Sequence, residues 1–395
     1  MLITYLILLF SLTIVTADNY FVTLKEGETF EDFYASDYKY PEDLRVKDLI
    51  AKTFSIGKFK GFVGDFSKKM LERLKKCPYI NEVSPDIEIQ SLDVVSEKYP
   101  PRHLGRISQR KRLKKKFKYL YDTEVSGKDV VAFVIDSGVY TGHPEFEGRA
   151  RSGVDLTGDG PGDKNGHGTH VAGIIGSSTY GVSKKVNIVE VKALADNGNG
   201  SLSKIIAAVE FCINYLKKNG KLGVANLSLG SSANSILNMA IDSAVDDGLI
   251  VVAAAGNAGK NACAYSPASA EKAITVGSID DRTDNLAFFS NYGPCVEILA
   301  PGVNIASVNF NETSVKYLSG TSMSSPIVTG IVANLLSAGV HPTDIRRKLL
   351  SSATEGKVKK VSLLLKAKTP NLIAFLDTPI TEGDSESDVE IDDED

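Results

Sequence analysis

Five short apolar stretches are the sequence feature that most constrains the fold. They are unbroken and rich in β-branched residues, and they cover residues 130–135, 186–191, 224–229, 249–255 and 274–277. Continuous apolar runs predict strands that are covered on both faces, whereas alternation would predict a half-exposed sheet. Helical patterns at residues 203–216 and 235–247 separate some of these runs. The alternation predicts an α/β domain with a mostly parallel central sheet and right-handed crossovers.

Three candidate site positions lie just past the ends of predicted strands. They are Asp136, Gly230 and Asn257. In open parallel sheets, ligands bind outside the carboxyl ends of the strands. We therefore expect these positions to gather at one edge of the sheet.

Reactive side chains next to glycines occur in three distant segments. Asp136 lies in residues 134–138, His167 in 165–173 and Ser322 in 319–326. Together they supply a carboxylate, an imidazole and a hydroxyl, the parts of an activated nucleophile. His170, three residues after His167, suggests a metal site, but no glutamate lies between them and no third ligand is evident.

With Asp, His and Ser in this order, the chain resembles the subtilisin-like serine proteases, most closely the proteinase K branch. The resemblance implies a three-layer subtilisin-like fold. It also implies a nucleophile (Ser322), a general base (His167) and a carboxylate that orients the base (Asp136). Ser322 would start a helix whose first turn contains Pro326, a tolerated place for proline. His170 would be structural.

The resemblance also assigns substrate contacts. Asn257 would donate its side-chain amide to the oxyanion, together with the Ser322 backbone N–H. Two edge segments would hold the peptide as an added strand, and Gly256 would form part of a pocket wall. The edge residues are Gly198, Asn199 and Gly200 on one side and Ser228, Leu229 and Gly230 on the other. Since the walls near Gly256 and Ala268 carry no acid, we expect a broad preference for apolar or aromatic residues.

Cysteine and metal assignments follow from the same resemblance. Cys263 and Cys295 would form a disulfide, Cys212 would be buried and free, and Cys77 would belong to a propeptide. Glu297 corresponds to an acid of a family calcium site, although the neighbouring segment near residues 271–273 differs. No cofactor is required for the chemistry, and a structural calcium ion stays an open alternative.

The ends of the chain indicate a secreted zymogen. Residues 1–17 have the apolar run and small residues of a signal peptide, and the run is too short for a stable membrane anchor. Residues 18–93 resemble a small α+β inhibitory propeptide. In it we predict strands at 20–24 and 80–89, a helix at 68–76 and a turn at 61–64, and we place the processing point near residues 92–94. The catalytic domain would cover 94–376, and the acidic, disordered tail 377–395.

Partners and destination follow from these assignments. The partners would be protein or peptide substrates and the chain's own propeptide, and the net charge of −4 gives no case for nucleic acid. The destination would be extracellular, the cell wall or a lytic vacuole, with a glycosylation sequon at Asn311. The basic run 109–118 predicts a solvated loop; a processing site, an anionic partner and attraction to the acidic tail are alternatives.

Three other functions are weaker alternatives. A kexin-type proprotein convertase would need an acidic pocket and a following β-rich domain. A peptide-binding pseudoprotease would be expected to lack a triad member, and none is missing. An α/β-hydrolase esterase would need a glycine in place of Ser324 and a different order of residues.

Overall fold

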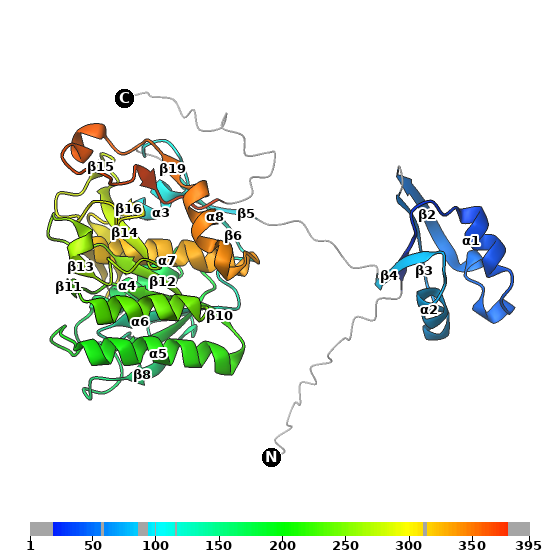
Figure 1. Cartoon of the computed structure of the whole chain (residues 1–395), viewed down its shortest axis with the longest axis horizontal. Helices are drawn as coiled ribbons and strands as arrows, with labels where there is room; N and C mark the ends of the chain where they lie inside the picture. Colours follow the sequence, from blue (N-terminus) through cyan, green and yellow to red (C-terminus); the bar gives the residue numbers. More distant parts are fainter. Residues whose placement is uncertain are drawn as a thin grey trace, which may run out of the picture. The chain divides into compact units, whose positions relative to one another are not determined.

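The computed structural model describes residues 19–56, 59–85, 94–98, 100–114, 117–310 and 314–377. The chain forms two compact units, Met1–Ser91 and Leu92–Asp395 (Figure 1). The predicted signal peptide, residues 92 and 93 of the predicted processing point, the Asn311 sequon and the tail beyond residue 377 lie outside the described residues.

The first unit is a four-stranded antiparallel sheet with two helices. The sheet order is β2-β3-β1-β4, with β1 at Tyr20–Leu24, β2 at Ile50–Ile56, β3 at Phe59–Gly64 and β4 at Ile80–Pro85. Helices α1 (Phe30–Asp37) and α2 (Lys68–Lys75) contribute Phe33 and Leu74 to a core that also contains Val22 and Phe62. This architecture agrees with the predicted α+β class.

The predicted turn at residues 61–64 is wrong, because these residues are the last four of the six residues of β3. Their glycines serve close packing instead. A Cβ atom on Gly61 would lie 2.7 Å from the Phe21 ring, and one on Gly64 would lie 2.3 Å from the Leu49 carbonyl oxygen. Glycine inside a strand often marks such a close approach.

The second unit is built on one large, mostly parallel sheet, as predicted. Its order is β19-β20-β16-β14-β12-β10-β7-β9-β8. All neighbours along this order are parallel except β19 and β20, and β15 (Asn285–Leu286) adds an antiparallel pair to β14. The strands are β7 (Val130–Asp136), β8 (Ala150–Asp155), β9 (Asn187–Lys192), β10 (Leu222–Leu227), β12 (Ile250–Ala254), β14 (Ile274–Asp280), β16 (Ile298–Pro301), β19 (Thr354–Glu355) and β20 (Leu372–Ile373).

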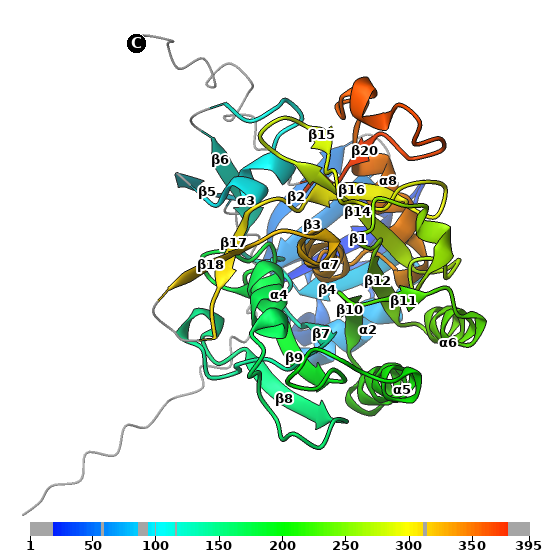
Figure 2. The same cartoon turned by 90° about the vertical axis from the view of Figure 1, so that its left-hand side faces the viewer.

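Helices cover both faces of this sheet, which gives three layers (Figure 2). Alternate residues of β7 enter two separate cores. Val131, Phe133 and Ile135 pack with α5 (Leu202–Asn219) and α6 (Ser235–Asp246). On the other face, the core formed with α4 (His167–Gly176) and α7 (Thr321–Ser337) contains Val130, Ala132 and Val134.

Shorter elements complete the second unit. They are the helices α3 (Arg102–Ile107) and α8 (Ile345–Ser352), and the antiparallel pairs β5 (Val94–Lys98) with β6 (Lys118–Asp122), β11 (Ser231–Ser232) with β13 (Tyr265–Ser266) and β17 (Ile305–Val308) with β18 (Val315–Leu318). Single 3-10 turns in the two units lie at Glu42–Leu44, Lys47–Leu49, Pro144–Phe146, Ala262–Ala264, Pro342–Asp344 and Lys360–Leu363. Within the described residues, no helix is both long and apolar enough to cross a bilayer.

The basic run 109–118 is only in part a solvated loop. Lys111, Arg112 and Lys114 are exposed, as predicted. Arg110, however, lies over the Phe375 ring, 4.0 Å from its centroid, and donates to two backbone carbonyls of the segment at the end of α8. This arginine therefore anchors the loop to α8 and to the segment that contains Phe375.

Candidate active site

Asp136 and His167 form a hydrogen-bonded pair at the carboxyl end of the sheet. Asp136 is the last residue of β7 and is fully buried, and its Oδ1 lies 2.7 Å from His167 Nδ1. The same oxygen accepts from the Ser137 backbone N–H at 2.7 Å. His167 is the first residue of α4. The charge of Asp136 raises the pKa of His167 above its usual 6.5, although burial of the ring acts in the opposite direction.

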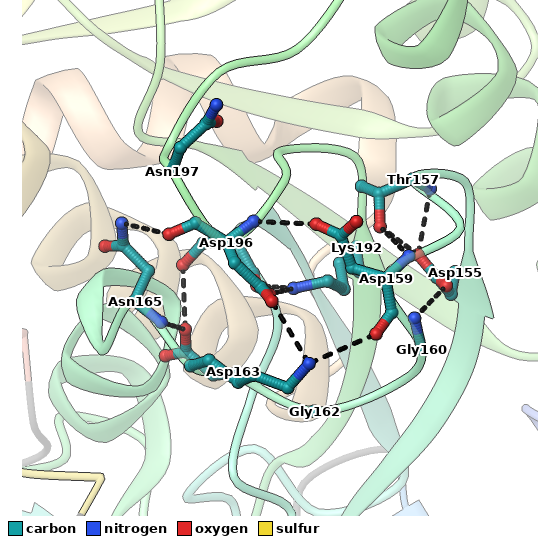
Figure 3. Close-up of polar contacts among 12 residues, drawn as sticks. Asp155, Thr157, Asp159, Gly160, Gly162, Asp163, Asn165, Lys192, Asp196 and Asn197 are labelled. Carbon is teal, nitrogen blue, oxygen red and sulfur yellow. Dashed lines mark hydrogen bonds and ion pairs between the residues drawn. The ribbon is translucent and has the colours of Figure 1, made fainter.

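The start of α4 is fixed by Asp163, which sequence reasoning did not single out. Its Oδ1 accepts from the Ser137 hydroxyl and from the backbone N–H groups of Asn165 and Gly166. Its Oδ2 accepts from the backbone and the hydroxyl of Thr169. Asp163 thus joins the turn after β7 to the helix that carries His167. Figure 3 shows its contact with Asn165. The only sequence signal for this role of Asp163 is its position four residues before the histidine that begins the helix.

Ser322 is the second residue of α7, and its hydroxyl contacts the loop that directly follows β10. Ser322 Oγ lies 3.4 Å from the Ser228 carbonyl oxygen, to which it donates. Although both residues are described, the structure contains no hydrogen bond between Ser322 and His167. Catalytic hydrogen bonds are often long without substrate and tighten when it binds.

Pro326 lies deeper in α7 than predicted, because it is the sixth residue of the helix and not part of the first turn. A proline there cannot donate to the carbonyl four residues earlier, which belongs to Ser322. The Ser228 hydroxyl takes over this role and donates to the Ser322 carbonyl at 2.9 Å. Ser228 therefore has a side-chain function that was missed when it was assigned only as a substrate-edge residue.

Asn257 is oriented so that its amide N–H groups are available. Its Oδ1 accepts from the backbone N–H of Thr321 at 2.8 Å and from the Thr321 hydroxyl at 2.9 Å. The residue is exposed three positions after β12 ends. With the oxygen used in this way, Nδ2 is the group left to face a ligand beside Ser322.

A groove of about 580 Å³ lies beside Asp136 and His167. All six predicted edge residues line it, together with Asp136 and His167. Its lining consists of Asp136, Ser137, Asn165, His167, Leu194, Gly198, Asn199, Gly200, Ser201, Leu202, Ile205, Ser228, Leu229, Gly230, Ser231, Asn234 and Leu237. Gly256, Asn257 and Ser322 are not part of this lining.

Gly256 instead supports the residues around Asn257. Its N–H donates to the Thr321 hydroxyl at 3.0 Å, and its φ of +99° is a conformation that favours glycine. A Cβ atom there would lie 2.4 Å from Asn291 Nδ2. No larger residue fits at this position without displacing that amide.

His170 is buried on α4 and bonds to a different part of the chain from His167. Its Nε2 lies 3.0 Å from the carbonyl oxygen of Lys316 in β18. Burial lowers the pKa of His170 to about 4, so the ring is neutral near pH 7. The contact joins α4 to the β17–β18 hairpin, as a structural role requires.

The cysteines lie where the resemblance implied. Cys263 and Cys295 form a disulfide with their Cα atoms 5.3 Å apart. Cys212 is free and buried in α5, and burial raises the pKa of its thiol. Cys77 is free and buried in the first unit.

The surroundings of Glu297 do not fit a calcium ion. The Arg346 guanidinium forms an ion pair with the Glu297 carboxylate, to which its Nε donates at 3.0 Å. Both Nη groups of Arg346 donate to the Glu271 carbonyl oxygen at 3.0 Å. The oxygens that would hold a cation here are therefore already bound to a side-chain cation, and a metal would have to displace it.

Comparisons with known proteins agree with this geometry. Residues 127–366 match the model of the subtilase family. The chain is similar to the subtilase-type proteinase RRT12 of Saccharomyces cerevisiae, with 40% identity over 91% of this chain and 82% of the relative. It is also similar to the subtilisin-like serine protease Pen ch 18 of Penicillium rubens, with 40% identity over 82% of this chain and 69% of the relative.

A solved structure gives the same result for the fold. The crystal structure of a cold adapted subtilisin-like serine proteinase superimposes with a TM-score of 0.64 at 37% identity. The match covers 71% of this chain and 99% of that one.

Proposed function

Since the chain belongs to the subtilase family of serine proteases, we propose that it is an endopeptidase whose triad is Asp136, His167 and Ser322. The observation that carries this proposal is the 2.7 Å contact between His167 Nδ1 and Asp136 Oδ1 at the wall of the groove. This contact leaves His167 Nε2 to accept the proton of the proposed nucleophile, Ser322.

The reaction would proceed through an acyl-enzyme. Ser322 Oγ attacks the carbonyl carbon of the scissile bond, while His167 Nε2 takes the hydroxyl proton and Asp136 stabilises the imidazolium. The oxyanion receives hydrogen bonds from Asn257 Nδ2 and the Ser322 N–H. His167 then gives its proton to the leaving amine. A water molecule, deprotonated by the same ring, hydrolyses the ester and restores the hydroxyl.

Substrates would bind as an added strand between the segments 198–200 and 228–230. Backbone hydrogen bonds recognise the peptide in this mode, so the sequence requirement is loose. Apolar side chains of Leu194, Leu229 and Leu237 line the groove, and Asp136, the only acid among its described lining residues, is bound to His167. We infer a broad preference for apolar or aromatic side chains. A cleavage profile dominated by Lys or Arg would contradict this.

The chain would be made as a secreted zymogen. Residues 1–17 would direct export, and residues 18–93 would block the groove until cleavage near residues 92–94. The separate compact unit that ends at Ser91 supports a removable domain. The destination would be outside the cell, the cell wall or a lytic vacuole, with proteins as substrates.

Labelling with a fluorophosphonate probe tests the proposal. The probe should modify the mature protein at Ser322 and should not modify Ser322→Ala, which should also keep residues 18–93. An Asn257→Ala variant should still be labelled but should turn over about 100- to 1,000-fold more slowly. A mature protein that neither reacts nor cleaves casein would contradict the proposed activity.

A further inference from the structure

Lys192 is a fully buried lysine that contacts Ser137, one of the residues that line the groove. It is the last residue of β9, and its side chain has 0% exposure. Its Nζ donates to the Ser137 carbonyl oxygen at 2.6 Å and to Asp196 Oδ1 at 2.8 Å. A buried ammonium is costly unless it is paired and hydrogen-bonded. Its presence here therefore calls for a role beyond packing.

One end of this contact holds the turn that carries Asp136. The Asp136 carbonyl oxygen accepts from the backbone N–H groups of Ala193 and Leu194, at 3.0 and 3.1 Å. The next carbonyl, that of Ser137, accepts from Lys192. Both carbonyls of the turn are thus bound by residues 192–194. The position of this segment therefore sets the direction of the Asp136 side chain.

The other end holds the loop that leads to the predicted substrate edge. Asp196 Oδ2 accepts from Lys164 at 3.1 Å, and the Asp196 carbonyl accepts from Asn165 Nδ2 at 3.1 Å, two residues before His167. The Asp196 N–H donates to Asp159 Oδ2 at 2.9 Å. Figure 3 shows Asp196 and Lys192 with Asn165 on one side and Asp159 on the other.

Asp196 is also inside the turn that presents the edge. Gly198 donates its N–H to the Ala195 carbonyl, and Ala195 donates its own to the Asn199 carbonyl, each at 2.8 Å. A shift of Asp196 would therefore move Gly198 and Asn199 relative to the groove.

We propose that Lys192 and Asp196 are a positioning pair that joins the substrate edge 198–200 to the turn that carries Asp136. The inference rests on the proposed function, because it takes that edge to bind peptide. Asp196 holds the edge, and Lys192 holds both the edge and the turn. Substrates that reach the edge depend on both residues, and substrates that react at the triad without reaching it depend on Lys192 alone.

Two substrates separate these roles. One is a peptide with four residues before the scissile bond, and the other is an ester of a single acylated amino acid. For Asp196→Asn, which keeps an acceptor for Lys192, we expect kcat/KM to fall about 10-fold on the peptide, mainly through KM, and to change less than about 2-fold on the ester. For Lys192→Met, which removes the donor to Ser137, we expect a fall of about 10-fold or more on both substrates.

Lys164→Met is the matched control. Lys164 also pairs with Asp196, but its side chain is 65% exposed. Exposed ion pairs contribute little, so both substrates should react at about the wild-type rate. If Asp196→Asn does not fold, the double variant Lys192→Met/Asp196→Ala leaves no unpaired buried charge and should lose more on the peptide than on the ester.

All rates are divided by the number of sites titrated with fluorophosphonate, so that unfolded protein does not count. Equal losses on both substrates for Asp196→Asn, or no loss on the peptide, would overturn the pair while leaving the proposed protease intact. An unchanged ester rate for Lys192→Met would overturn its link to Asp136. A wild-type protein that neither titrates nor cleaves would instead refute the proposed function.

Discussion

The bond from the Ser228 hydroxyl to the Ser322 carbonyl predicts a specific coupling with Pro326. Ser228 is buried, and the bond is 2.9 Å long. In Ser228→Ala the Ser322 carbonyl loses this donor, and Pro326 lacks the N–H that would replace it in a regular helix. An unsatisfied buried polar group costs about 1–3 kcal/mol. Because Ser322 is half-buried, we expect about 1–2 kcal/mol and a fall of roughly 2–6 °C in the unfolding midpoint.

Replacing the proline should relieve this cost. In Pro326→Ala the restored N–H donates to Ser322 within α7, so Ser228→Ala should cost about 1 kcal/mol less in that background. Ser228 Oγ also accepts from Asn226 Nδ2 at 2.8 Å. That loss is the same in both backgrounds and therefore cancels in the double-mutant cycle.

Thermal unfolding at one fixed scan rate measures the four proteins. Each is first inactivated at Ser322 with a phosphonate, so that self-digestion does not interfere. Ser231→Ala, which removes an exposed hydroxyl from the same segment, is the control and should lie within about 0.5 kcal/mol of its parent. Equal shifts for Ser228→Ala in the wild-type and Pro326→Ala backgrounds would refute the reasoning.

Three further predictions concern charge and covalent links. The raised pKa of His167 keeps the ring protonated to higher pH, so kcat/KM should fall on the acid side with a pKa above 6.5. Asp136→Asn should move this acid limb to lower pH. An acid limb below 6.5 in the wild-type protein would contradict the prediction. Arg346→Ala should lower the unfolding free energy by about 1–2 kcal/mol in EDTA, because it frees two charge-assisted acceptors; an unchanged melt would be inconsistent with this role. Replacing Cys263 and Cys295 by serine opens a cross-link with a sequence separation of 32 and should cost about 3–4 kcal/mol in urea unfolding, whereas a cost under about 1 kcal/mol would contradict it.

The centre of the sheet was predictable, and its edges were not. The five apolar runs correspond to β7, β9, β10, β12 and β14, with ends that differ by at most three residues. Strand β8 was missed because three of its six residues are exposed and it has no apolar run. Edge strands pack on fewer neighbours, so their sequences carry a weaker signal.

The candidate site was predictable as a set of residue types, but not as a set of contacts. The order of the three motifs along the chain predicted Asp136, His167 and Ser322 as the catalytic candidates. The pairing of Glu297 with Arg346 crosses 49 positions of the chain, and neither residue lies in a motif. Such contacts depend on how distant loops meet, which local patterns do not encode.

The helix that carries Ser322 has a second consequence for the molecule. Helix α7 packs against β7, β10, β12, β14 and β16, so it fills the interior as well as presenting the hydroxyl. A chain still emerging from the ribosome lacks this helix until more than four-fifths of its residues have been made. Under the proposed function, a copy that ends before α7 would lack both the nucleophile and the helix that completes the interior.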